Sequence, residues 1–324
     1  MMEIVTKKRM QIFSGRGHRV LAREVADHLG MQLGDVDIHE FASGELYCRY
    51  RENIRGSDVF VFQPHSRPVN DRIWEQLVLI DAAKRASAKR IIAVCPFYGY
   101  ARQDRKARSR EPITARLLAD MLTTAGADRV VSVDLHTGQV QGFFNKPLDH
   151  LTALPLLVDW LIKRFGDEEL VVCSPDAGGV RLASKFADRL PHANLAVLAK
   201  TRTAHNVAQT LGVIGPVAGK TCVLVDDMID TAGTLCGAAA ALVENGAHRV
   251  VACATHPVLS ADACKKLMDS AIEQVVVTNA LPIPDDCELP GKLEVVSIAG
   301  ILANTMRAIF EEESVSELFD DDNQ

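Results

Sequence analysis

Residues 221–234 constrain the fold of this chain more than any other stretch. An apolar run at 221–225 contains β-branched valines and is followed directly by Asp226 and Asp227. Small and hydroxylated residues come next, and then an alanine-rich segment at 235–245. This order predicts a strand buried on both faces of a parallel sheet, then a tight turn and a helix N-terminus.

The turn carries chemical groups that suit a sugar phosphate. The free N–H groups and the positive dipole end of a helix favour a phosphate. Thr231 and Thr234 add hydroxyl donors, and Gly233 allows the backbone to approach a ligand closely. Asp226 and Asp227 can accept hydrogen bonds from sugar hydroxyls or hold a hydrated Mg²⁺. The alternative is an ordinary α/β turn in which an Asp and a Thr cap the helix.

The same stretch resembles the ribose 5-phosphate loop of the type I phosphoribosyltransferase fold, in the form found in ribose-phosphate pyrophosphokinases. A third carboxylate and a short run of small residues complete the match. The resemblance implies that ribose 5-phosphate is bound by Asp226, Asp227, Asp230, Thr231, Ala232, Gly233 and Thr234.

The two halves of the chain look related. Residues 21–29 and 182–190 agree at their Leu, Ala, Ala, Asp and Leu positions, and residues 88–93 resemble 247–252 at nearly the same offset. Amphipathic segments can match by chance, but two matches in one order favour a duplicated doubly wound domain. The first copy lacks an acidic loop like that at 226–234, so we expect it to be a scaffold for that site.

We therefore expect an α/β protein with two tandem doubly wound parallel-sheet domains of the phosphoribosyltransferase type. The first would carry the ATP segments and the second the ribose 5-phosphate site. A C-terminal tail would pack back on the N-terminal domain. The expected bounds are 1–150, 151–310 and 311–324.

Composition limits the other classes of protein. A chain of 324 residues can form two domains with full cores, and its net charge of -6 argues against nucleic acid as a partner. No apolar run reaches membrane-spanning length, and the N-terminus lacks a signal-peptide core. Most of the eight cysteines lie in apolar strand-like runs and are interpreted as reduced core residues, as at Cys95, Cys173, Cys222 and Cys253. We expect a soluble, cytoplasmic protein with no nucleic-acid or membrane partner.

Residues 98–111 follow a predicted buried strand and contain five cations. Charge alone is equally typical of a solvated basic loop. The Tyr-Ala-Arg-Gln-Asp run before most of these cations resembles a signature of the ribose-phosphate pyrophosphokinases, where forked arginine donors suit a polyphosphate. The resemblance implies that Arg102, Gln103 and Asp104 contact ATP.

Two other strand ends carry single functional candidates. His136 ends a Val-Asp-Leu-His run, and by itself a histidine at such a place is more often capped or part of a core. The resemblance implies that it ligates the Mg²⁺ on ATP or binds the ATP phosphates. Asp176 belongs to Pro-Asp-Ala-Gly-Gly-Val, which could simply be a glycine turn with a capping Asp. The resemblance implies a ribose-phosphate and metal role, with Mg²⁺ as the cofactor.

Lys200 and Arg202 leave a predicted strand at 195–199 and enter a polar loop. Two cations in a loop are usually surface residues. The resemblance implies a mobile catalytic loop, in which both cations stabilise charge that develops on a transferred phosphoryl group.

Residues 41–45 resemble the adenine-binding segment of the family. Phe41 would stack on the base and Glu45 would accept a hydrogen bond from its amino group. Ser43 stands where Asp or Asn is usual, which weakens the case for one base contact. Because the family builds this site between subunits, the resemblance implies an oligomer, expected to be a homohexamer built from dimers. A softer match implies an allosteric phosphate site near Asn53, Arg55, Ser314 and Ser316.

All of these segments occur in family order. The resemblance implies transfer of the pyrophosphoryl group of Mg·ATP to the C1 hydroxyl of ribose 5-phosphate, giving AMP and 5-phospho-α-D-ribose 1-diphosphate for purine, pyrimidine, histidine and NAD synthesis. Two alternatives stay open. A phosphoribosyltransferase would share the loop at 226–234 but would not need the segment at 98–111. A non-catalytic regulatory homologue would be expected to lose Lys200, Arg202 or His136, and all three are present.

Overall fold

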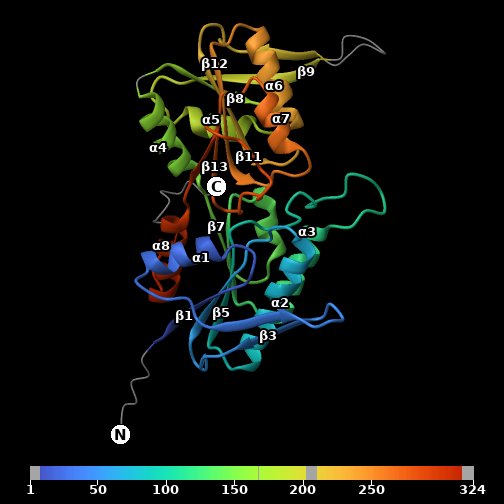
Figure 1. Cartoon of the computed structure of the whole chain (residues 1–324), viewed down its shortest axis with the longest axis vertical. Helices are drawn as coiled ribbons and strands as arrows, with labels where there is room; N and C mark the ends of the chain where they lie inside the picture. Colours follow the sequence, from blue (N-terminus) through green and yellow to red (C-terminus); the bar gives the residue numbers. More distant parts are fainter. Residues whose placement is uncertain (1–7, 167, 202–209, 316–324) are drawn as a thin grey trace. The chain divides into compact units, whose positions relative to one another are not determined.

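The computed structural model of the chain describes residues 8–166, 168–201 and 210–315. The chain divides into two compact α/β units (Figure 1). Unit 1 comprises Met1–Thr152 together with Ala299–Gln324, and unit 2 comprises Ala153–Ile298.

Unit 1 is built on a parallel sheet with strand order β1-β4-β5-β6-β7, and a separate antiparallel hairpin, β2–β3, packs against helix α2. Its strands are β1 Met10–Ser14, β2 Val36–Glu40, β3 Leu46–Tyr50, β4 Asp58–Phe62, β5 Arg90–Cys95, β6 Arg129–Val133 and β7 Leu148–Leu151. Its helices are α1 Arg19–His28, α2 Val69–Arg85, α3 Thr114–Ala125, the 3-10 helix Gly138–Phe143 and α8 Ala299–Glu311.

Unit 2 is built on a sheet with strand order β10-β9-β8-β11-β12-β13-β14, in which β10 alone pairs antiparallel within the described residues. Its strands are β8 Leu170–Ser174, β9 Asn194–Thr201, β10 Thr210–Ile214, β11 Thr221–Ile229, β12 Arg249–Pro257, β13 Gln274–Thr278 and β14 Leu293–Val296. Its helices are α4 Leu154–Phe165, α5 Val180–Ala187, α6 Gly233–Glu244 and α7 Ala263–Asp269.

The two units share one topology. The strand order β1-β4-β5-β6-β7 of unit 1 corresponds strand by strand to β8-β11-β12-β13-β14 of unit 2. The sequence matches fall at equivalent places, since residues 21–29 lie in and just after α1 and residues 182–190 in and just after α5. The prediction of a duplicated doubly wound fold is confirmed.

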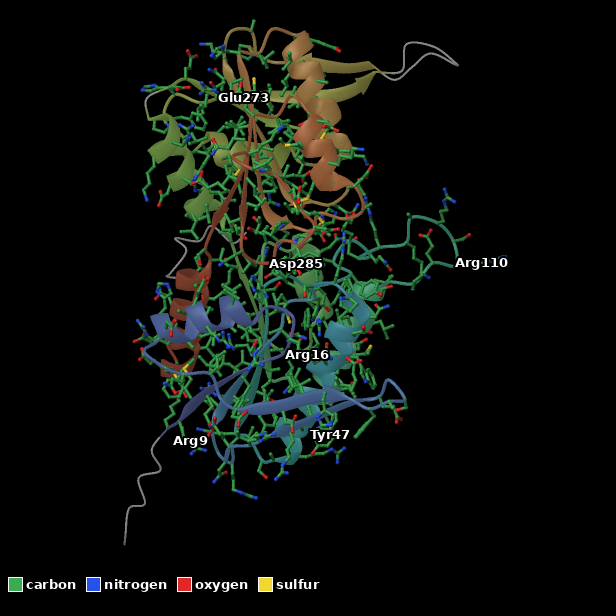
Figure 2. All side chains as sticks on the ribbon, viewed as in Figure 1. Arg9, Arg16, Tyr47, Arg110, Glu273 and Asp285 are labelled. Atoms are coloured by element: carbon green, nitrogen blue, oxygen red, sulfur yellow. A yellow bond between two sulfur atoms is a disulfide. The ribbon has the colours of Figure 1, made fainter. Side chains whose placement is uncertain are left out.

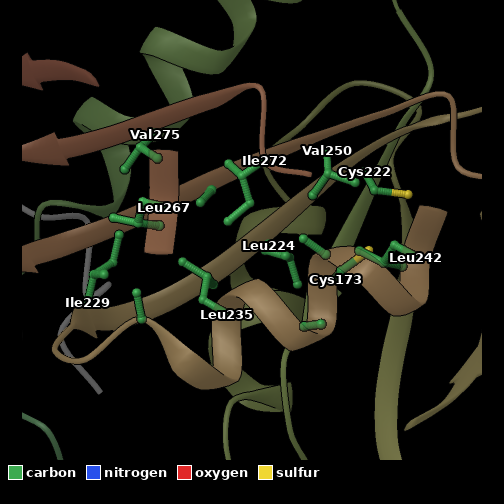
Figure 3. Packing of buried hydrophobic residues seen from close by; sticks show 14 of the residues in the cluster. Cys173, Cys222, Leu224, Ile229, Leu235, Leu242, Val250, Leu267, Ile272 and Val275 are labelled. Carbon is green, nitrogen blue, oxygen red and sulfur yellow. The ribbon is translucent and has the colours of Figure 1, made fainter. Parts of the chain in front are cut away.

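Strand β11 and helix α6 form the centre of the core of unit 2 (Figure 3). The apolar residues at 222–225 are fully buried, as expected for a strand covered on both faces. Leu235, Ala238, Ala239 and Leu242 of α6 recur at helical spacing and are buried against the sheet. Figure 3 shows Leu235 and Leu242 on the side of the helix that faces Leu224.

Several predicted boundaries differ from the structure near this centre. Strand β11 continues to Ile229, so Asp226 and Asp227 lie within the strand, and Asp226 pairs with Ala254 of β12. Helix α6 begins at Gly233, two residues earlier than the composition indicated. The strand is longer than the apolar run because its parallel neighbour β12 extends the ladder as far as Ile229.

Lys200 was expected in a loop, and this placement is wrong. Its backbone lies in β9, where it pairs with Leu211 of β10. The antiparallel pairing of β9 with β10 extends the strand past Ala199, and the sequence of β10 has no clear periodicity that would have predicted this partner. Arg202 lies outside the described residues.

Helix α8 belongs to unit 1, although the sequence placed residues 299–310 with the C-terminal domain. It packs against α1, and Figure 1 shows the two helices side by side. Arg90 of β5 donates a hydrogen bond to the Ile309 carbonyl at 3.4 Å, and Lys8 pairs with Glu312 at 2.9 Å. The start of the predicted tail therefore contacts unit 1.

The cysteines divide into two groups. Cys95, Cys173, Cys222 and Cys253 are free and buried in strands, as predicted. Cys264 and Cys287 form a disulfide that the sequence did not indicate. No helix in the described part of the chain is long and apolar enough to cross a membrane.

The ion pair between Arg90 and Asp58 gives a prediction for the stability of unit 1. Asp58 is 1% exposed, and Arg90 also reaches the end of α8. Arg90→Ala would leave a buried carboxylate without its cation and lower the free energy of unfolding by about 3 kcal/mol, measured by urea denaturation. Arg116→Ala, which breaks the exposed pair with Asp120, should cost less than about 0.5 kcal/mol. Equal losses in the two variants would contradict this account.

Candidate functional site

The turn between β11 and α6 in unit 2 has the geometry of an anion site. Ala232 precedes the helix with a left-handed backbone, φ 59°, and its methyl side chain cannot cap the N–H groups of the first turn. A Cβ added at Gly233 would meet no protein atom within 4 Å. Packing therefore does not require glycine at this position, and the open side of the turn is available to a ligand.

The left-handed residue of this turn is not a glycine. A residue with a Cβ in this conformation costs about 1–2 kcal/mol relative to a right-handed one. Ala232 is 6% exposed, so surrounding atoms hold it in place. Non-glycine residues with left-handed backbones are frequent at ligand-binding turns, and Ala232 is such a residue.

The carboxylates of β11 repel one another. Burial, together with the neighbouring charges of Asp227 and Asp176, raises the pKa of Asp226 to about 8. The Asp227 N–H donates to Asp226 Oδ1 at 2.9 Å, which opposes this rise only in part. In the absence of a ligand, Asp226 therefore retains a proton near neutral pH.

Asp176 follows β8, the strand that pairs parallel with β11. The turn after β8 and the turn after β11 therefore both lie at the carboxyl ends of the strands. Its Oδ1 accepts the N–H groups of Gly178 at 2.8 Å and Gly179 at 3.0 Å. This is the capped glycine turn that the sequence offered as the alternative. The charge of this carboxylate also contributes to the raised pKa of Asp226.

Residues beyond β12 hold the β11–α6 turn, and sequence reasoning missed them. Ser260 donates its hydroxyl to the Asp230 carboxylate and its N–H to the Asp230 carbonyl, the latter at 2.9 Å. Lys266 of α7 donates to the Thr231 carbonyl at 3.5 Å. The nearness of β12 to β11 in the predicted sheet was the available signal, because it places the turn after β12 beside that after β11.

In unit 1, Asp104 joins two segments that the sequence linked to ATP. Its carboxylate is 7% exposed and accepts hydrogen bonds from Thr137 at 2.7 Å and from Gln139. Burial alone would raise the pKa of Asp104, but these hydrogen bonds outweigh it and lower the pKa below its ordinary value. Since Thr137 follows His136, this contact brings the His136 turn to the segment that begins at Arg102.

Arg102, Gln103 and His136 are exposed in the same region of unit 1. Gln103 is fixed against α3, because its side chain accepts the Thr114 hydroxyl at 2.6 Å and its carbonyl accepts the Ala115 N–H at 3.2 Å. The remaining cations continue along the loop to Arg110, which Figure 2 shows at the outer end. Gln103 at the base of the loop is therefore fixed in position, while the tip of the loop extends away from α3.

The other predicted adenine contacts lie at the tip of the β2–β3 hairpin. Phe41 is 51% exposed and meets Tyr47 edge to face, with ring centroids 5.8 Å apart. The Ser43 hydroxyl donates to Glu45 at 3.0 Å. These three residues form an exposed apolar and acidic tip on a hairpin that packs against α2, whereas the Arg102 segment leads into α3.

The predicted effector residues fall in two places. Asn53 and Arg55 line a groove of about 500 Å³ in unit 1 that also contains Arg49 and Arg85. The Arg55 N–H donates to Asn53 Oδ1 at 3.0 Å, and Arg9 donates to the Asn53 carbonyl. Ser314 follows α8 but is not among the groove residues, and Ser316 lies outside the described residues. The side chain of Lys200, like Arg202, is not among the described parts.

Comparison with known proteins agrees over most of the chain. A family model described as the N-terminal domain of ribose phosphate pyrophosphokinase matches residues 10–126. A second, described as the phosphoribosyl synthetase-associated domain, matches residues 194–320.

Whole proteins match as well. Ribose-phosphate pyrophosphokinases of Streptomyces avermitilis and Synechococcus elongatus are each 51% identical to this chain. The alignments cover 97% of this chain and 97% of the first relative, and 96% of this chain and 94% of the second. The crystal structure of phosphoribosylpyrophosphate synthetase from Mycobacterium smegmatis matches with a TM-score of 0.90 and 51% identity, covering 94% of this chain and 100% of that one. The chain belongs to the ribose-phosphate pyrophosphokinase family.

Proposed function

We propose that this chain transfers the pyrophosphoryl group of ATP to the C1 hydroxyl of ribose 5-phosphate, with unit 2 binding the sugar phosphate and unit 1 binding the nucleotide. The products are AMP and 5-phospho-α-D-ribose 1-diphosphate. The observation that carries the proposal is the β11–α6 turn, where uncapped helix N–H groups and paired carboxylates lie at one sheet edge. This arrangement suits a ligand with a phosphate at one end and hydroxyls at the other.

The 5-phosphate would bind at the first turn of α6. The N–H groups there point out of the helix, and the hydroxyls of Thr231 and Thr234 add donors. Asp230 braces the loop through Ser260. Asp226 and Asp227 would accept hydrogen bonds from the ribose hydroxyls, which become stronger as Asp226 gives up its proton.

The nucleotide would bind to the exposed donors of unit 1. Arg102 presents a planar fork of N–H donors for phosphate oxygens. Gln103 would add an amide N–H donor and His136 an imidazole N–H donor. Asp104 holds these two segments together. Phe41 would stack on the adenine, with Glu45 on its amino group and Ser43 beside it. Because that hairpin tip is exposed, we propose that it serves the nucleotide site across a subunit boundary.

The carboxylates of unit 2 fit a hydrated Mg²⁺. Burial and the repulsion between these carboxylates both raise the pKa of Asp226. A divalent cation would offset the negative charge and so remove the repulsion. The described residues contain no ready-made cluster of three metal ligands, and Mg²⁺ keeps several waters and needs only one or two carboxylates. We propose Asp226, Asp227 and Asp176 as its partners, and His136 as a contact to the metal or the phosphates of ATP. When bound, Mg²⁺ neutralises charge on the phosphoryl groups.

Catalysis would come chiefly from alignment and charge neutralisation. The C1 oxygen attacks the β-phosphorus in line as AMP leaves, through a loose transition state that needs little proton transfer. Lys200 and Arg202 would stabilise the charge on the transferred group. No general base is required for this scheme.

The groove that contains Arg49 and Arg55 also contains Arg85, which pairs with Asp81, and the carboxylate of Glu52, so that cations are in excess; we propose that it binds phosphate as a regulatory anion. We further propose a cytoplasmic homohexamer built from dimers. A groove of about 580 Å³ beside α2 and α3 contains Trp74 and Leu117, each 56% exposed, a surface suited to a second copy. The buried free thiols are typical of a reducing compartment.

One assay separates this function from its alternatives. AMP release from ATP should require ribose 5-phosphate and should match the amount of diphosphorylated sugar that forms. A phosphoribosyltransferase would instead consume the diphosphate sugar together with a base. A regulatory homologue would release no AMP by itself, and that result would overturn the proposal.

Gly233→Ala tests the phosphate turn. The added methyl meets no protein atom within 4 Å, so folding should be unaffected, but it would occupy the side from which the phosphate approaches. We expect the KM for ribose 5-phosphate to rise by roughly tenfold or more, while the KM for ATP stays unchanged. Gly300→Ala in α8, where a Cβ also meets nothing within 4 Å, is the matched control and should change neither constant. An unchanged KM for ribose 5-phosphate in Gly233→Ala would remove the turn from the site.

Asp227→Asn tests the carboxylate repulsion. Because the folded pKa of Asp226 is about 8 and the unfolded value is near 4, the folded protein binds more protons between these pH values. Its stability should therefore fall as pH rises from about 4 to 8. Removing the Asp227 charge lowers the pKa of Asp226, although burial still raises it. At pH 8 the variant should be more stable by about 1 kcal/mol for each unit by which the substitution lowers the pKa of Asp226. It should nevertheless bind ribose 5-phosphate more weakly. Urea unfolding at several pH values measures this, and identical pH slopes would refute it.

Lys200→Ala tests the proposed catalytic cation. Turnover should fall by about a hundredfold or more, with smaller changes in the KM values, since the cation acts on charge that develops during transfer. Lys220, which pairs with Glu169 at the other end of β11, offers a control cation whose replacement by Ala should leave turnover near normal. Steady-state rates would decide between the two outcomes.

A further inference from the structure

The segment after β12 braces the ribose 5-phosphate turn on one side. Leu259 and Ser260 donate their N–H groups to the carbonyls of Ile229 and Asp230, at 2.8 and 2.9 Å. Leu259 and Ala261 both have left-handed backbones, with φ of 44° and 53°. Conformations of this kind persist only where the surrounding structure enforces them, so the brace depends on what holds the segment that follows.

That following segment is helix α7, which also contacts the turn directly. Lys266 pairs with Asp262 at 2.8 Å and donates to the Thr231 carbonyl at 3.5 Å. The helix has seven residues and is too short to be stable by itself. Its position therefore depends on tertiary contacts, of which the buried side chains of Ala263 and Leu267 are one part.

The other part comes from the connection between β13 and β14. Lys292 donates to the carbonyls of Leu267 at 2.6 Å, Met268 at 3.2 Å and Ser270 at 3.2 Å, at the C-terminal end of α7. Cys287 of the same connection is joined by a disulfide to Cys264 in the first turn of α7. One connection thus fixes both ends of the helix, by a cation at one end and a covalent bond at the other.

This disulfide packs against the outside of the core of unit 2 and not within its strands. Cys264 and Cys287 are half-buried, whereas Cys95, Cys173, Cys222 and Cys253 are buried in strands. In a chain whose other cysteines are free, a disulfide outside the buried strands is the bond that an added thiol would exchange with.

We infer that the Cys264–Cys287 disulfide is a thiol-exchange site that sets how firmly the ribose 5-phosphate turn is held. The inference rests on the proposed role of residues 230–234 in binding ribose 5-phosphate. The reactant is a dithiol. One of its thiolates attacks a sulfur of the disulfide to form a mixed disulfide, and its second thiol displaces the protein sulfur. Two electrons and two protons pass to the protein, which gains two thiols, and the dithiol leaves as its own disulfide.

Reduction frees the first turn of α7, the end nearest Ser260, while the Lys292 contacts hold the other end. The brace on Asp230 and Thr231 then becomes less ordered. The turn must then become ordered when the sugar phosphate binds. Because this ordering costs free energy, the affinity for ribose 5-phosphate falls. The nucleotide segments belong to unit 1, and their affinity for ATP is expected to stay the same.

The test uses the full chain before and after treatment with dithiothreitol. Alkylation with iodoacetamide under denaturing conditions should label six cysteines before reduction and eight after it. The KM for ribose 5-phosphate should rise about three- to tenfold on reduction, with the KM for ATP unchanged within twofold. The double variant Cys264→Ser/Cys287→Ser should show the raised KM without treatment and should not respond to dithiothreitol.

Each other result overturns the inference. Eight labelled cysteines in the untreated protein would mean that the disulfide does not form. An unchanged KM after reduction of the wild-type chain would mean that Lys292 and the buried side chains hold the brace alone, and this measurement does not depend on how the variant folds. If Gly233→Ala also leaves the KM for ribose 5-phosphate unchanged, the role of the turn fails first. If Gly233→Ala raises that KM and reduction does not, only the thiol-exchange inference fails.

Discussion

The repulsion between carboxylates in the C-terminal half of β11 dominates the electrostatics of the proposed site in unit 2. Asp226 and Asp227 are adjacent in one strand and half-buried, and Asp176 faces them from the turn after β8. Like charges close together in a region of low dielectric are unfavourable, and retaining a proton on Asp226 reduces this repulsion. A doubly wound sheet places such turns together at the carboxyl edge of neighbouring strands, which is where ligands of this class of fold bind. The acidic residues are therefore an unfavourable feature that a cation or a polyol would relieve.

The duplicated unit 1 shows what the same edge looks like without this feature. At the ends of β1 and β4, the counterparts of β8 and β11, the Gln63 amide accepts the Gly17 N–H at 2.9 Å and donates to the buried Glu75 at 2.9 Å. Arg16 donates to the same carboxylate at 2.6 Å. A Cβ at Gly15 or Gly17 would collide with Gln63. Arg16 and Glu75 are paired with each other and Gln63 fills the space between the two strand ends, so this end of unit 1 has no counterpart of the unpaired carboxylates of unit 2.

Local sequence predicted the centre of the site but not its tertiary partners. The β11 strand, the turn and α6 could be predicted because the apolar run, the small residues and the alanine-rich helix are contiguous. The hydrogen bond that Asp104 accepts from Thr137, and the contacts of Ser260 and Lys266, could not, because each depends on a partner or a turn brought near by the fold. Helix α8 packs against α1, a partner that its own apolar residues do not specify. The Cys264–Cys287 disulfide was missed for the same reason, since its two cysteines are 23 residues apart with no motif between them.

The strained and charged features of unit 2 point to one conclusion about stability and binding. Ala232 holds a left-handed backbone, Leu259 and Ala261 do so beside it, and Asp226 keeps a proton against its ordinary tendency. Each of these lowers the stability of the ligand-free protein, and of the four non-glycine residues with left-handed backbones in the described part of unit 2, only His192 lies away from this turn. If they were accidents of packing, there would be no reason for them to concentrate where uncapped helix N–H groups face open space. Concentration at this turn is expected if the rest of the sheet holds it in a binding conformation before the ligand arrives, so that less ordering remains when the ligand binds.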